Sequence, residues 1–572
     1  MVNFDKPLST PEPDYPTLPA EIELPEEDIS PEEGALPSGA FADNLAETLF
    51  SDDNTLLTMA TDLIQLFDAD KRSRSDWEQA YVKGLEYLGM KTEERSEPWE
   101  GACGVYHPLL TEAVVRFQSQ AITEIFPAPG PARTKIMGRQ PEEKVQQAQR
   151  IEDEMNYILT EKMTEYRNET EQVLFRLPLV GSVLRKVYYD PTSKRPQAIM
   201  VPAEDFVINY GSSDLKSGER YTHVMKRTKN ELKKMMATGF YRTLEIQEPS
   251  PVYSKVDEAH DKISGRTPTM DTDTRHTILE FHTDYDLGEH DYACPYIITI
   301  EQTSQKVLGI RRNWREGDES YQKRIHFAHY QYMPGMGFYG TGLVHLIGGL
   351  ARSATSILRQ LVDSGTLANL PAGFKTKGLK VKNDGDPLHP GEFRDVDVAS
   401  GALKDNIIPL PIKEPSQTLY SLLNTIVDEG RRIASIADLD VGDMNQQAPV
   451  GTTLALLERS MKIMSAVHAR LHAALKEELK LIAEIVGTQM PPQYDWDPNN
   501  EFNRQEDFSD RARIEIIPVS DPNSSTMAQR VVQYQAVYQM AQTNPELYNM
   551  PMLHRKGLEA LQMKELISHI PH

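Results

Sequence analysis

The stretch of residues 339–487 constrains the fold of this chain more than any other. Its pattern predicts a helix, an excursion rich in glycine and proline, a second helix, an acidic loop and one very long helix. Apolar residues of the first helix recur at helical spacing, namely Leu343, Leu346, Ile347, Leu350, Ala354, Ile357, Leu358 and Leu361. The long helix is predicted to run from near Thr452 to Gly487, about 50 Å at the usual rise per residue. A helix of this length usually spans a bundle, a domain boundary or the wall of an assembly.

The rest of the chain predicts an α+β fold that is mainly helical. Helices are expected over residues 46–90 and 111–126, and Pro141 opens a long polar helix that reaches about Phe175. The expected strands are 182–189, 198–201, 206–209, 221–226, 277–285, 296–302, 306–311 and 325–332, from their β-branched and aromatic content. A short helix over 229–238, a polar surface loop over 248–274, a strand over 512–519 that returns to the earlier sheet, and two terminal helices complete the prediction.

The composition is that of a chain large enough for several cores. It has 572 residues, of which 39% are hydrophobic and 26% charged. Its two cysteines, Cys103 and Cys294, do not make a disulfide framework, so a reducing compartment is expected. We find no signal-peptide pattern and no apolar run long enough to span a bilayer, so no membrane partner is expected. Residues 1–45, rich in proline and acid, predict an extended arm.

The net charge restricts the kinds of partner. Acidic residues outnumber basic ones by 85 to 61, which gives a formal charge of −24. Sequence-reading DNA binding needs a positive footprint, so this charge argues against it. An anionic wall can nevertheless guide a polyanion without holding it. From composition alone, the simpler explanation, that the acidity aids solubility, is favoured.

A glycine motif just before the first helix matches a dinucleotide-binding pattern. Gly335, Gly337 and Gly340 follow a strand-like run and precede a helix, which is the context that such a site needs. The match fails further on, because Asp363, near the distance of a ribose-binding acid, lies at the end of a predicted helix with no strand before it. We favour a structural role, in which the glycines serve a tight turn and let the helix start close to neighbouring backbone.

Other motifs for catalysis or metal binding are incomplete. Gly373 and Gly378 have the outer spacing of a P-loop but lack the lysine and hydroxyl that must follow. The acidic loop resembles the opening of a calcium loop, but Pro449 takes the place of the bidentate glutamate. His326 and His329 are three residues apart in a strand-like run and so point to opposite faces. The sequence therefore predicts no catalytic residue, no cofactor and no metal site.

For two surfaces, the sequence leaves two interpretations open. The apolar stripe of the long helix is most simply core, although its near-heptad spacing also permits packing on a copy of itself. The clearest basic cluster consists of Lys375, Lys377, Lys380 and Lys382. It is either a solvated strand edge protected by lysines or a docking surface for an acidic partner or DNA phosphate.

The order of the elements, together with several local phrases, resembles the portal proteins of tailed bacteriophages, most closely those of short-tailed phages. The phrases are GSVLRKVYYD at 181–190, VPAED at 201–205, YGTGL at 339–343 and RQLVDSG at 359–365. The resemblance runs from about residue 45 to the C-terminus, and it is the ordered set, rather than any one phrase, that carries it. The arm has no clear counterpart.

The resemblance implies a portal-type subunit of a dodecameric ring. Its parts would be an arm (1–45), a wing (46–338), stem helices (339–369 and 416–437), a clip between them (370–415), a tunnel loop (438–452), a long wing helix (453–487), a return strand (488–523) and crown helices (524–572). The family is structural and not itself an enzyme.

The resemblance also assigns roles to individual residues. The tunnel loop would present Asp438, Asp440, Asp443, Asn445, Gln446 and Gln447 to DNA. The clip would dock partners through Lys375, Lys377, Lys380 and Lys382. Gly348 and Gly349 would let stem helices approach closely, and Arg431 and Arg432 would bridge to an adjacent subunit's acid or face the channel.

The implied setting is one vertex of a virion capsid, after assembly in the host cytoplasm. The expected partners are further copies of the chain, double-stranded DNA passing without sequence preference, the terminase large subunit, the tail adaptor, and the major capsid and scaffolding proteins. The alternatives are a non-portal scaffold or adaptor built on long helices, and a nucleotide-binding enzyme that uses the loop 335–340.

Overall fold

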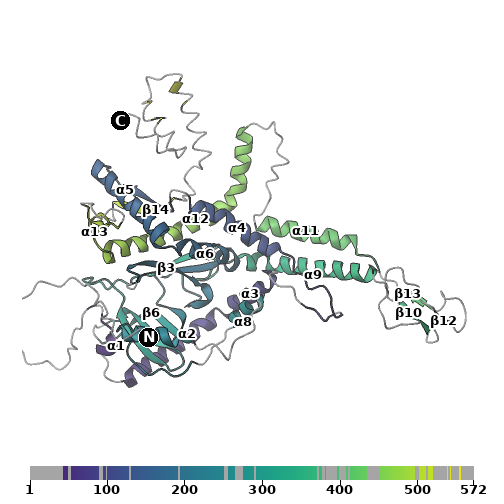
Figure 1. Cartoon of the computed structure of the whole chain (residues 1–572), viewed down its shortest axis with the longest axis horizontal. Coiled ribbons are helices and arrows are strands. Elements are labelled where there is room, and N and C mark those ends of the chain that lie inside the picture. The colour runs from purple at the N-terminus through teal and green to yellow at the C-terminus, as the bar shows by residue number, and fades with distance from the viewer. Residues whose placement is uncertain are drawn as a thin grey trace, which may run out of the picture. The chain divides into compact units, whose positions relative to one another are not determined.

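The structure of the protein is a computed structural model (Figure 1). It describes residues 41, 43–48, 53–88, 94–97, 99–127, 130–190, 193–249, 255–264, 275–288, 292–369, 373–375, 380–381, 396–397, 407–409, 413–434, 450–495, 502–510, 513–519, 538, 541–542, 550 and 553–554. This part is mixed α/β, about half helical, with several sheets. The chain divides into two compact units, one of residues 1–119, 170–185 and 200–446, the other of residues 120–169, 186–199 and 447–572.

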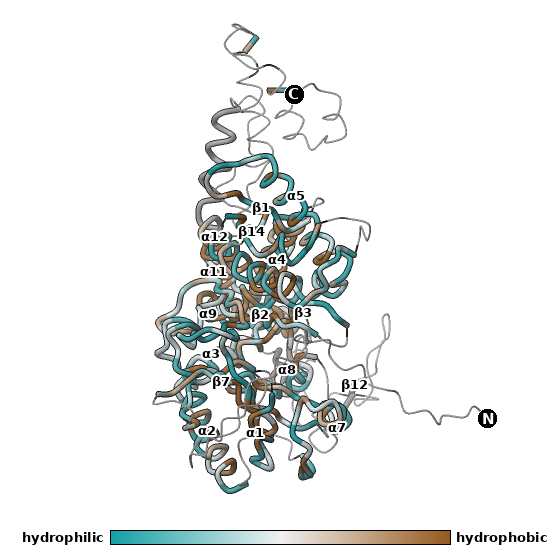
Figure 2. The backbone as a smooth tube through the Cα atoms, turned by 90° about the vertical axis from the view of Figure 1, so that its left-hand side faces the viewer, coloured by the Kyte–Doolittle hydropathy of each residue, from teal (hydrophilic) through white to brown (hydrophobic). Residues whose placement is uncertain are grey.

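The first unit contains a five-stranded antiparallel sheet. Its strands, in spatial order, are β4 (Phe206–Ile208), β5 (Arg220–Arg227), β6 (His276–Tyr285), β7 (Cys294–Glu301) and β8 (Lys306–Arg312). Side chains alternate between the two faces of a strand. Phe281 of β6 therefore packs with Phe67 of α2 (Asp53–Ser73), whereas Ile278 packs with Leu232 of α7 (Lys229–Ala237). Figure 2 shows brown apolar residues alternating with teal polar ones along α2, as expected of a helix that covers a sheet.

The edge of this sheet at β8 is satisfied by a side chain that precedes α1 (Leu45–Thr48). Asn44 Nδ2 donates to Leu308 O at 3.2 Å, and Ile310 N donates to Asn44 Oδ1 at 2.9 Å. Both groups belong to an outer strand and would otherwise be unpaired. Asn44 is buried, so this link fixes the segment that leads into α1 against the sheet.

The first unit also contains two long paired helices and three shorter helical elements. These are α3 (Ser75–Leu85), η1 (Glu86–Leu88), α8 (Lys255–Ser264), α9 (Leu343–Asn369) and α11 (Gln417–Ile433). α9 packs against both α3 and α11. Between α9 and α11 the described elements are two antiparallel pairs, β10 (Gly373–Lys375) with β13 (Ile407–Pro409) and β11 (Lys380–Val381) with β12 (Val396–Asp397). The two predicted helices are thus confirmed, and most of the predicted excursion between them lies outside the described residues.

The fold also contains a three-stranded sheet, in the order β3-β2-β9, and two further helices. The strands are β2 (Ser182–Asp190), β3 (Arg195–Pro202) and β9 (Phe327–Gln331), and the short helix η3 (Ala203–Asp205) follows β3. The helices are α4 (Leu109–Ile125) and α6 (Tyr166–Val180). The strands predicted between residues 182 and 332 are all present, with ends that differ by a few residues.

The second unit is built on the long helix α12 (Val450–Gln489) and a two-stranded sheet. Its remaining elements are β1 (Ala132–Ile136), α5 (Glu142–Tyr157), the π-helical turn η2 (Ile158–Lys162), α13 (Arg504–Asp507) and β14 (Ile514–Pro518). α5 packs on β1 and α12 on β14. A buried ion pair joins Arg504 to Glu154 at 2.9 Å, and both side chains are fully covered. The long helix is confirmed, two residues longer at each end than predicted.

Three sequence predictions are wrong in detail. The helix predicted from 141 to 175 is interrupted after η2, where Met163 leaves the helical region with φ −95° and ψ 68°. The strand predicted over 512–519 does not return to the earlier sheet, because β14 pairs with β1, a strand that the sequence did not suggest. The polar segment 248–274 contains α8, whose buried Val256 and Ala259 are too short an apolar stripe to stand out in a polar sequence.

Candidate functional site

The start of α9 is set by glycines that pack backbone against backbone. A Cβ at Gly340 would lie 2.4 Å from Gly181 O, and one at Gly342 would lie 2.4 Å from Leu179 O. Side chains cannot be accommodated at such distances, so the turn requires glycine at both positions. These contacts seat the first turn of α9 directly on the residues that lead into β2.

The packing around Gly335 and Gly337 argues against a dinucleotide site at this motif. A Cβ at Gly335 would lie 2.1 Å from Tyr339 O, and one at Gly337 would lie 2.2 Å from Tyr210 O. The space beside these glycines, which a phosphate would need, is therefore filled by the chain's own backbone. Within the residues that the structure describes, no group of three or more His, Cys, Asp or Glu side chains could hold a metal ion. The glycines serve close packing, as the structural interpretation predicted.

Tyr339 anchors α9 to the five-stranded sheet. Its hydroxyl donates to Phe206 O at 2.8 Å and accepts from Ile208 N at 3.2 Å and from Arg74 Nη1 at 2.9 Å. Its ring stacks on Trp77 with centroids 4.6 Å apart. Tyr339 and Arg74 are almost fully buried, so these bonds are shielded from water.

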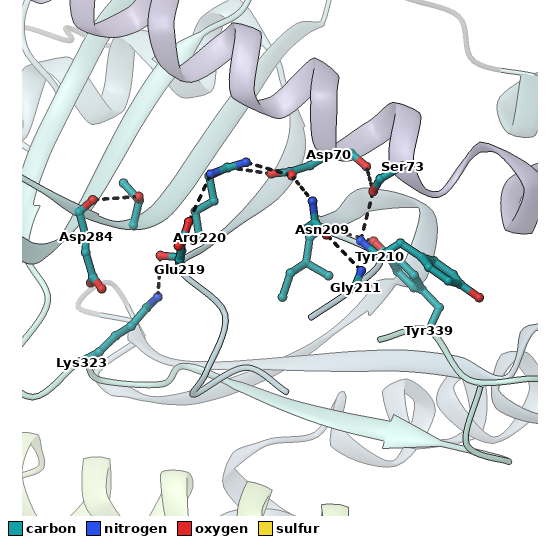
Figure 3. A network of polar contacts seen from close by, with 12 residues as sticks. Asp70, Ser73, Asn209, Tyr210, Gly211, Glu219, Arg220, Asp284, Lys323 and Tyr339 are labelled. Atoms are coloured by element: carbon teal, nitrogen blue, oxygen red, sulfur yellow. Dashed lines mark hydrogen bonds and ion pairs between the residues drawn. The ribbon is translucent and has the colours of Figure 1, made fainter. Parts of the chain in front are cut away.

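A second polar network, shown in Figure 3, holds α2 against the sheet beside this anchor. Asp70 accepts from Arg220 Nε at 2.8 Å and Nη2 at 3.0 Å, and from Asn209 Nδ2 at 3.2 Å. Further along, burial raises the pKa of Asp284 and lowers that of Lys323, and each charge opposes the other's shift. The bidentate Asp70–Arg220 pair fixes the position of the helix because its geometry is specific.

The paired helices α9 and α11 lie side by side (Figure 1). The residues that α9 buries are Leu343, Val344, Ile347, Gly348, Ala351, Ala354, Thr355 and Ile357, and α11 buries Leu423, Val427 and Gly430. Close approach through glycine occurs at Gly84, where a Cβ would lie 1.9 Å from Val344 Cγ1, and at Gly430, where it would lie 2.5 Å from Leu109 Cδ2. A Cβ at Gly348 or Gly349 would meet nothing within 4 Å in this chain.

The two arginines at the end of α11 have partners in their own chain. Arg431 Nη2 lies 3.2 Å from Glu112 Oε2 of α4, and Arg432 Nη2 lies 2.5 Å from Glu429 Oε1 one turn earlier. Burial, and then the Arg431 guanidinium, lower the pKa of nearby His107. The Arg431 pair ties α11 to α4, whereas Arg432, with a 75% exposed side chain, remains at the surface.

Besides the exposed charged residues Arg352, Asp428 and Arg432, the uncovered surface of the helix pair carries two further kinds of side chain. Exposed polar residues without a formal charge include Ser353, Ser356, Gln360, Thr418, Ser421, Asn424 and Thr425. Exposed large apolar or aromatic residues are Val362, Tyr420, Leu422 and Ile433. Hydroxyl and amide groups can contact a polyanion weakly, whereas apolar side chains at the surface indicate contact with another protein surface.

The remaining predicted site residues are described only in part. Asp438, Asp440, Asp443, Asn445, Gln446 and Gln447 lie outside the described residues, as do Lys377 and Lys382. Lys375 ends β10 and Lys380 begins β11. Most of the terminal helices predicted after residue 524 also lies outside the described ranges. No helix in the described part is long and apolar enough to cross a membrane.

The anchoring residues Arg74, Asp70 and Tyr339 were not anticipated from the sequence. Asp70 and Arg74 lie in segments without a recognisable motif of charge or spacing, and Tyr339 lies within the glycine motif, where the sequence predicted no role for it. Their partners are more than a hundred positions away in the chain. The one signal in the sequence is a charged residue at a position of helical spacing that would otherwise be apolar, as at Asp70 and Arg74.

Comparison with known proteins identifies the family. A family model described as phage SU10 portal protein matches residues 131–442, which is more than half of the chain. No curated protein matches it. The match includes β2, the sheet, the glycine turn, α9 and α11. The chain therefore belongs to the family of the phage SU10 portal protein, and it is a tailed-phage portal protein of the short-tailed type.

Proposed function

We propose that this chain closes into a dodecameric ring at one capsid vertex and serves as the conduit for DNA during packaging and ejection. The family match and the α9–α11 pair support this proposal. The observation that carries it is the surface of that pair, where uncharged polar groups lie beside exposed apolar side chains. In a ring, the apolar side chains would face neighbouring copies, and the uncharged polar groups would line a channel that does not hold DNA tightly.

The remaining parts of the chain take roles in this assembly. Residues 46–338 form the wing, 370–415 the clip, 438–452 the tunnel loop, 453–487 the long wing helix and 524–572 the crown. The clip docks the terminase large subunit during packaging and the tail adaptor afterwards, and the wing faces the major capsid and scaffolding proteins. The role is structural, and the energy for DNA movement comes from a separate motor protein.

The test of ring formation is direct. Purified full-length protein is imaged by negative-stain electron microscopy, and its mass is measured by mass photometry at several concentrations. We expect closed rings with a central hole and a mass near twelve times that of one 64.8 kDa chain. Particles without a hole, or a monomer at every concentration, would contradict the proposal.

The clip assignment gives a separate prediction. Replacing Lys375, Lys377, Lys380 and Lys382 with alanine removes four positive charges, so the affinity for the terminase large subunit or the tail adaptor should fall at least about tenfold. The melting temperature should stay within about 1 °C, because surface charges contribute little to stability. Binding is measured by surface plasmon resonance.

A matched control changes four exposed lysines elsewhere, namely Lys83, Lys135, Lys216 and Lys255. This variant should bind like the unmodified protein. Equal affinities for the clip variant and the control would remove the docking role of the clip lysines.

A further inference from the structure

A pocket of about 770 Å³ lies beside α9 in the first unit. It is lined by Glu86, Tyr87, Arg95, Trp99, Tyr106, residues of α9 and Lys413. Three aromatic side chains, Tyr87, Trp99 and Tyr106, form part of its wall. Four cations, Arg95, Arg352, Arg359 and Lys413, share it with two carboxylates. The pocket is thus locally positive in a chain whose formal charge is −24.

One of the carboxylates is already used by the pocket's own structure. Asp363 Oδ1 accepts from Cys103 N at 2.7 Å, and its Oδ2 lies 3.9 Å from Arg95 Nη1. Arg359 is also held in place: its Nε donates to Val105 O at 3.0 Å, and its guanidinium lies 4.4 Å from the Tyr106 ring centroid. These contacts fix a part of the pocket wall in which an aromatic ring and a cation lie together.

Two cations of the pocket have no polar partner among the described residues. Arg352 and Lys413 are both exposed, and neither has a hydrogen bond or ion pair to any other residue that the structure describes. Two free cations beside aromatic rings suit an extended segment that carries both carboxylates and prolines. Carboxylates form charge-assisted hydrogen bonds with arginine and lysine. Proline-rich segments pack their rings on grooves lined by tyrosine and tryptophan.

The chain itself contains such a segment. Residues 7–40 include nine acidic residues, eight prolines and no lysine or arginine. Seven of these acids lie between Glu21 and Glu33, with Pro25 and Pro31 among them. An extended segment of this length reaches about 100 Å, and its attachment to the rest of the chain near Phe41 keeps its local concentration high.

We propose that the pocket beside α9 is the docking site for residues 21–33 of the same chain's acidic arm. Carboxylates of the arm bind Arg352 and Lys413, and its prolines pack on the wall formed by Tyr87, Trp99 and Tyr106. The net charge of the pocket and the absence of lysine and arginine from residues 7–40 make the two surfaces complementary. This docking does not depend on ring formation.

Limited proteolysis of the full-length protein tests the proposal. A protease that cleaves after glutamate is added, and cleavage within residues 21–33 is followed by mass spectrometry. The variant R352A/K413A should be cleaved at least tenfold faster than the unmodified protein, because the arm is released. The matched control K135A/R139A, which removes an exposed lysine and an exposed arginine elsewhere, should be cleaved at the original rate. Equal rates in all three proteins would overturn the proposal.

Crosslinking identifies the source of the arm. Glu27→Cys and Ser356→Cys are introduced into a chain in which Cys103 and Cys294 are replaced by serine, and the protein is oxidised. Docking within one chain gives a crosslinked species of monomer mass on a denaturing gel. Covalent dimers and larger species would show that the arm comes from a neighbouring copy and would overturn the same-chain assignment.

A DNA oligonucleotide provides the remaining comparison, since phosphates and bases could also bind cations and aromatic rings. Fluorescence anisotropy of a labelled single-stranded oligonucleotide is measured with the unmodified protein and with R352A/K413A. We expect the pocket variant to change oligonucleotide binding less than twofold. Loss of oligonucleotide binding in R352A/K413A, with unchanged proteolysis of the arm, would assign the pocket to nucleic acid and reject the arm.

Discussion

At the scale of single residues, buried hydrogen bonds fix where α9 begins. The Tyr339 hydroxyl has three hydrogen-bond partners. Arg74 donates to the carbonyl oxygens of Ala203 and Phe206 as well as to that hydroxyl. Such groups contribute modestly when paired but cost much when one partner is lost, because the other stays buried without a bond. The position of α9 relative to the sheet of the same unit thus depends on a few polar atoms.

Tyr339→Phe should destabilise the protein by about 1–3 kcal/mol, because Arg74 and Ile208 N lose a buried partner. The measurement is denaturant unfolding followed by circular dichroism. Tyr420→Phe is the matched control, since the Tyr420 side chain is 52% exposed on α11. A loss of stability as large in Tyr420→Phe as in Tyr339→Phe would contradict the role assigned to the buried hydroxyl.

Asp205 in η3 gives a prediction on pH. Burial, followed by the charges of Glu204 and Asp257, raises the pKa of Asp205 from 3.8 to about 7. A raised pKa means that the folded state favours the protonated carboxyl. The contribution of Asp205 to stability is therefore complete below about pH 4 and is lost as the pH rises through 7.

Asp205→Asn should accordingly melt higher than the unmodified protein by an amount that grows between pH 5 and pH 8 and reaches about 2 °C. Nearby His260, whose pKa burial lowers, is present in both proteins and cancels in the difference. Asp214→Asn should show the opposite sign, because hydrogen bonds from Ser217 lower the pKa of Asp214. A melting difference for Asp205→Asn that does not vary with pH would contradict the assignment.

At the scale of elements, α9 shows two kinds of glycine. Gly340 and Gly342, just before the helix, are required by backbone contacts inside the chain. Gly348 and Gly349, inside it, have open space around the position of a Cβ, although glycine weakens a helix. Glycine at a helix interior position with no internal need for it is consistent with close packing against a neighbouring copy in the proposed ring.

Replacing Gly348 and Gly349 together with alanine should leave the single chain as stable or stabilise it by about 1 kcal/mol per residue. Ring assembly should fail or weaken at least tenfold, because the added methyl groups occupy the space of the neighbour's helix. Thermal melting measures the first effect and mass photometry the second. Ser353→Ala, exposed on the same helix, is the control. Rings that form normally from the double variant would reject the stem role of these glycines.

At the scale of the whole molecule, charge is the property that the proposed function uses. In the proposed ring, the formal charge of −24 per chain, repeated around the axis, would give DNA an anionic surrounding. Within it, Asp438, Asp440 and Asp443 would form a collar, and Asn445, Gln446 and Gln447 would make weak, reversible contacts. A conduit for DNA of any sequence benefits from repulsion because tight phosphate contacts would stall movement.

Changing Asp438, Asp440 and Asp443 to asparagine should slow DNA passage severalfold or make it more sensitive to salt, while rings still assemble. The measurement is the rate of DNA packaging into heads in vitro at two salt concentrations. A control with equal charge loss changes Glu142, Glu143 and Glu161, all exposed, to glutamine. Packaging at an unchanged rate in the aspartate variant would remove the tunnel-loop role.

The sequence by itself determined the elements and the family of this protein. Apolar periodicity places α9, α11 and α12, because each buries one face and its spacing shows in the local sequence. The resemblance to portal proteins rests on ordered phrases and is confirmed by the family match. Local sequence also showed that the glycine turn lacks a second strand, which was enough to doubt a nucleotide site.

Only the tertiary structure decided which elements meet. The pairing of β1 with β14, the anchor of Tyr339 on β4 and the pairing of Arg431 with Glu112 join residues far apart in the chain. Such contacts depend on how the segments close in space, and a single sequence gives no local signal for them. The pocket beside α9 is the same case: its cations are dispersed between residues 95 and 413, and only folding brings them together.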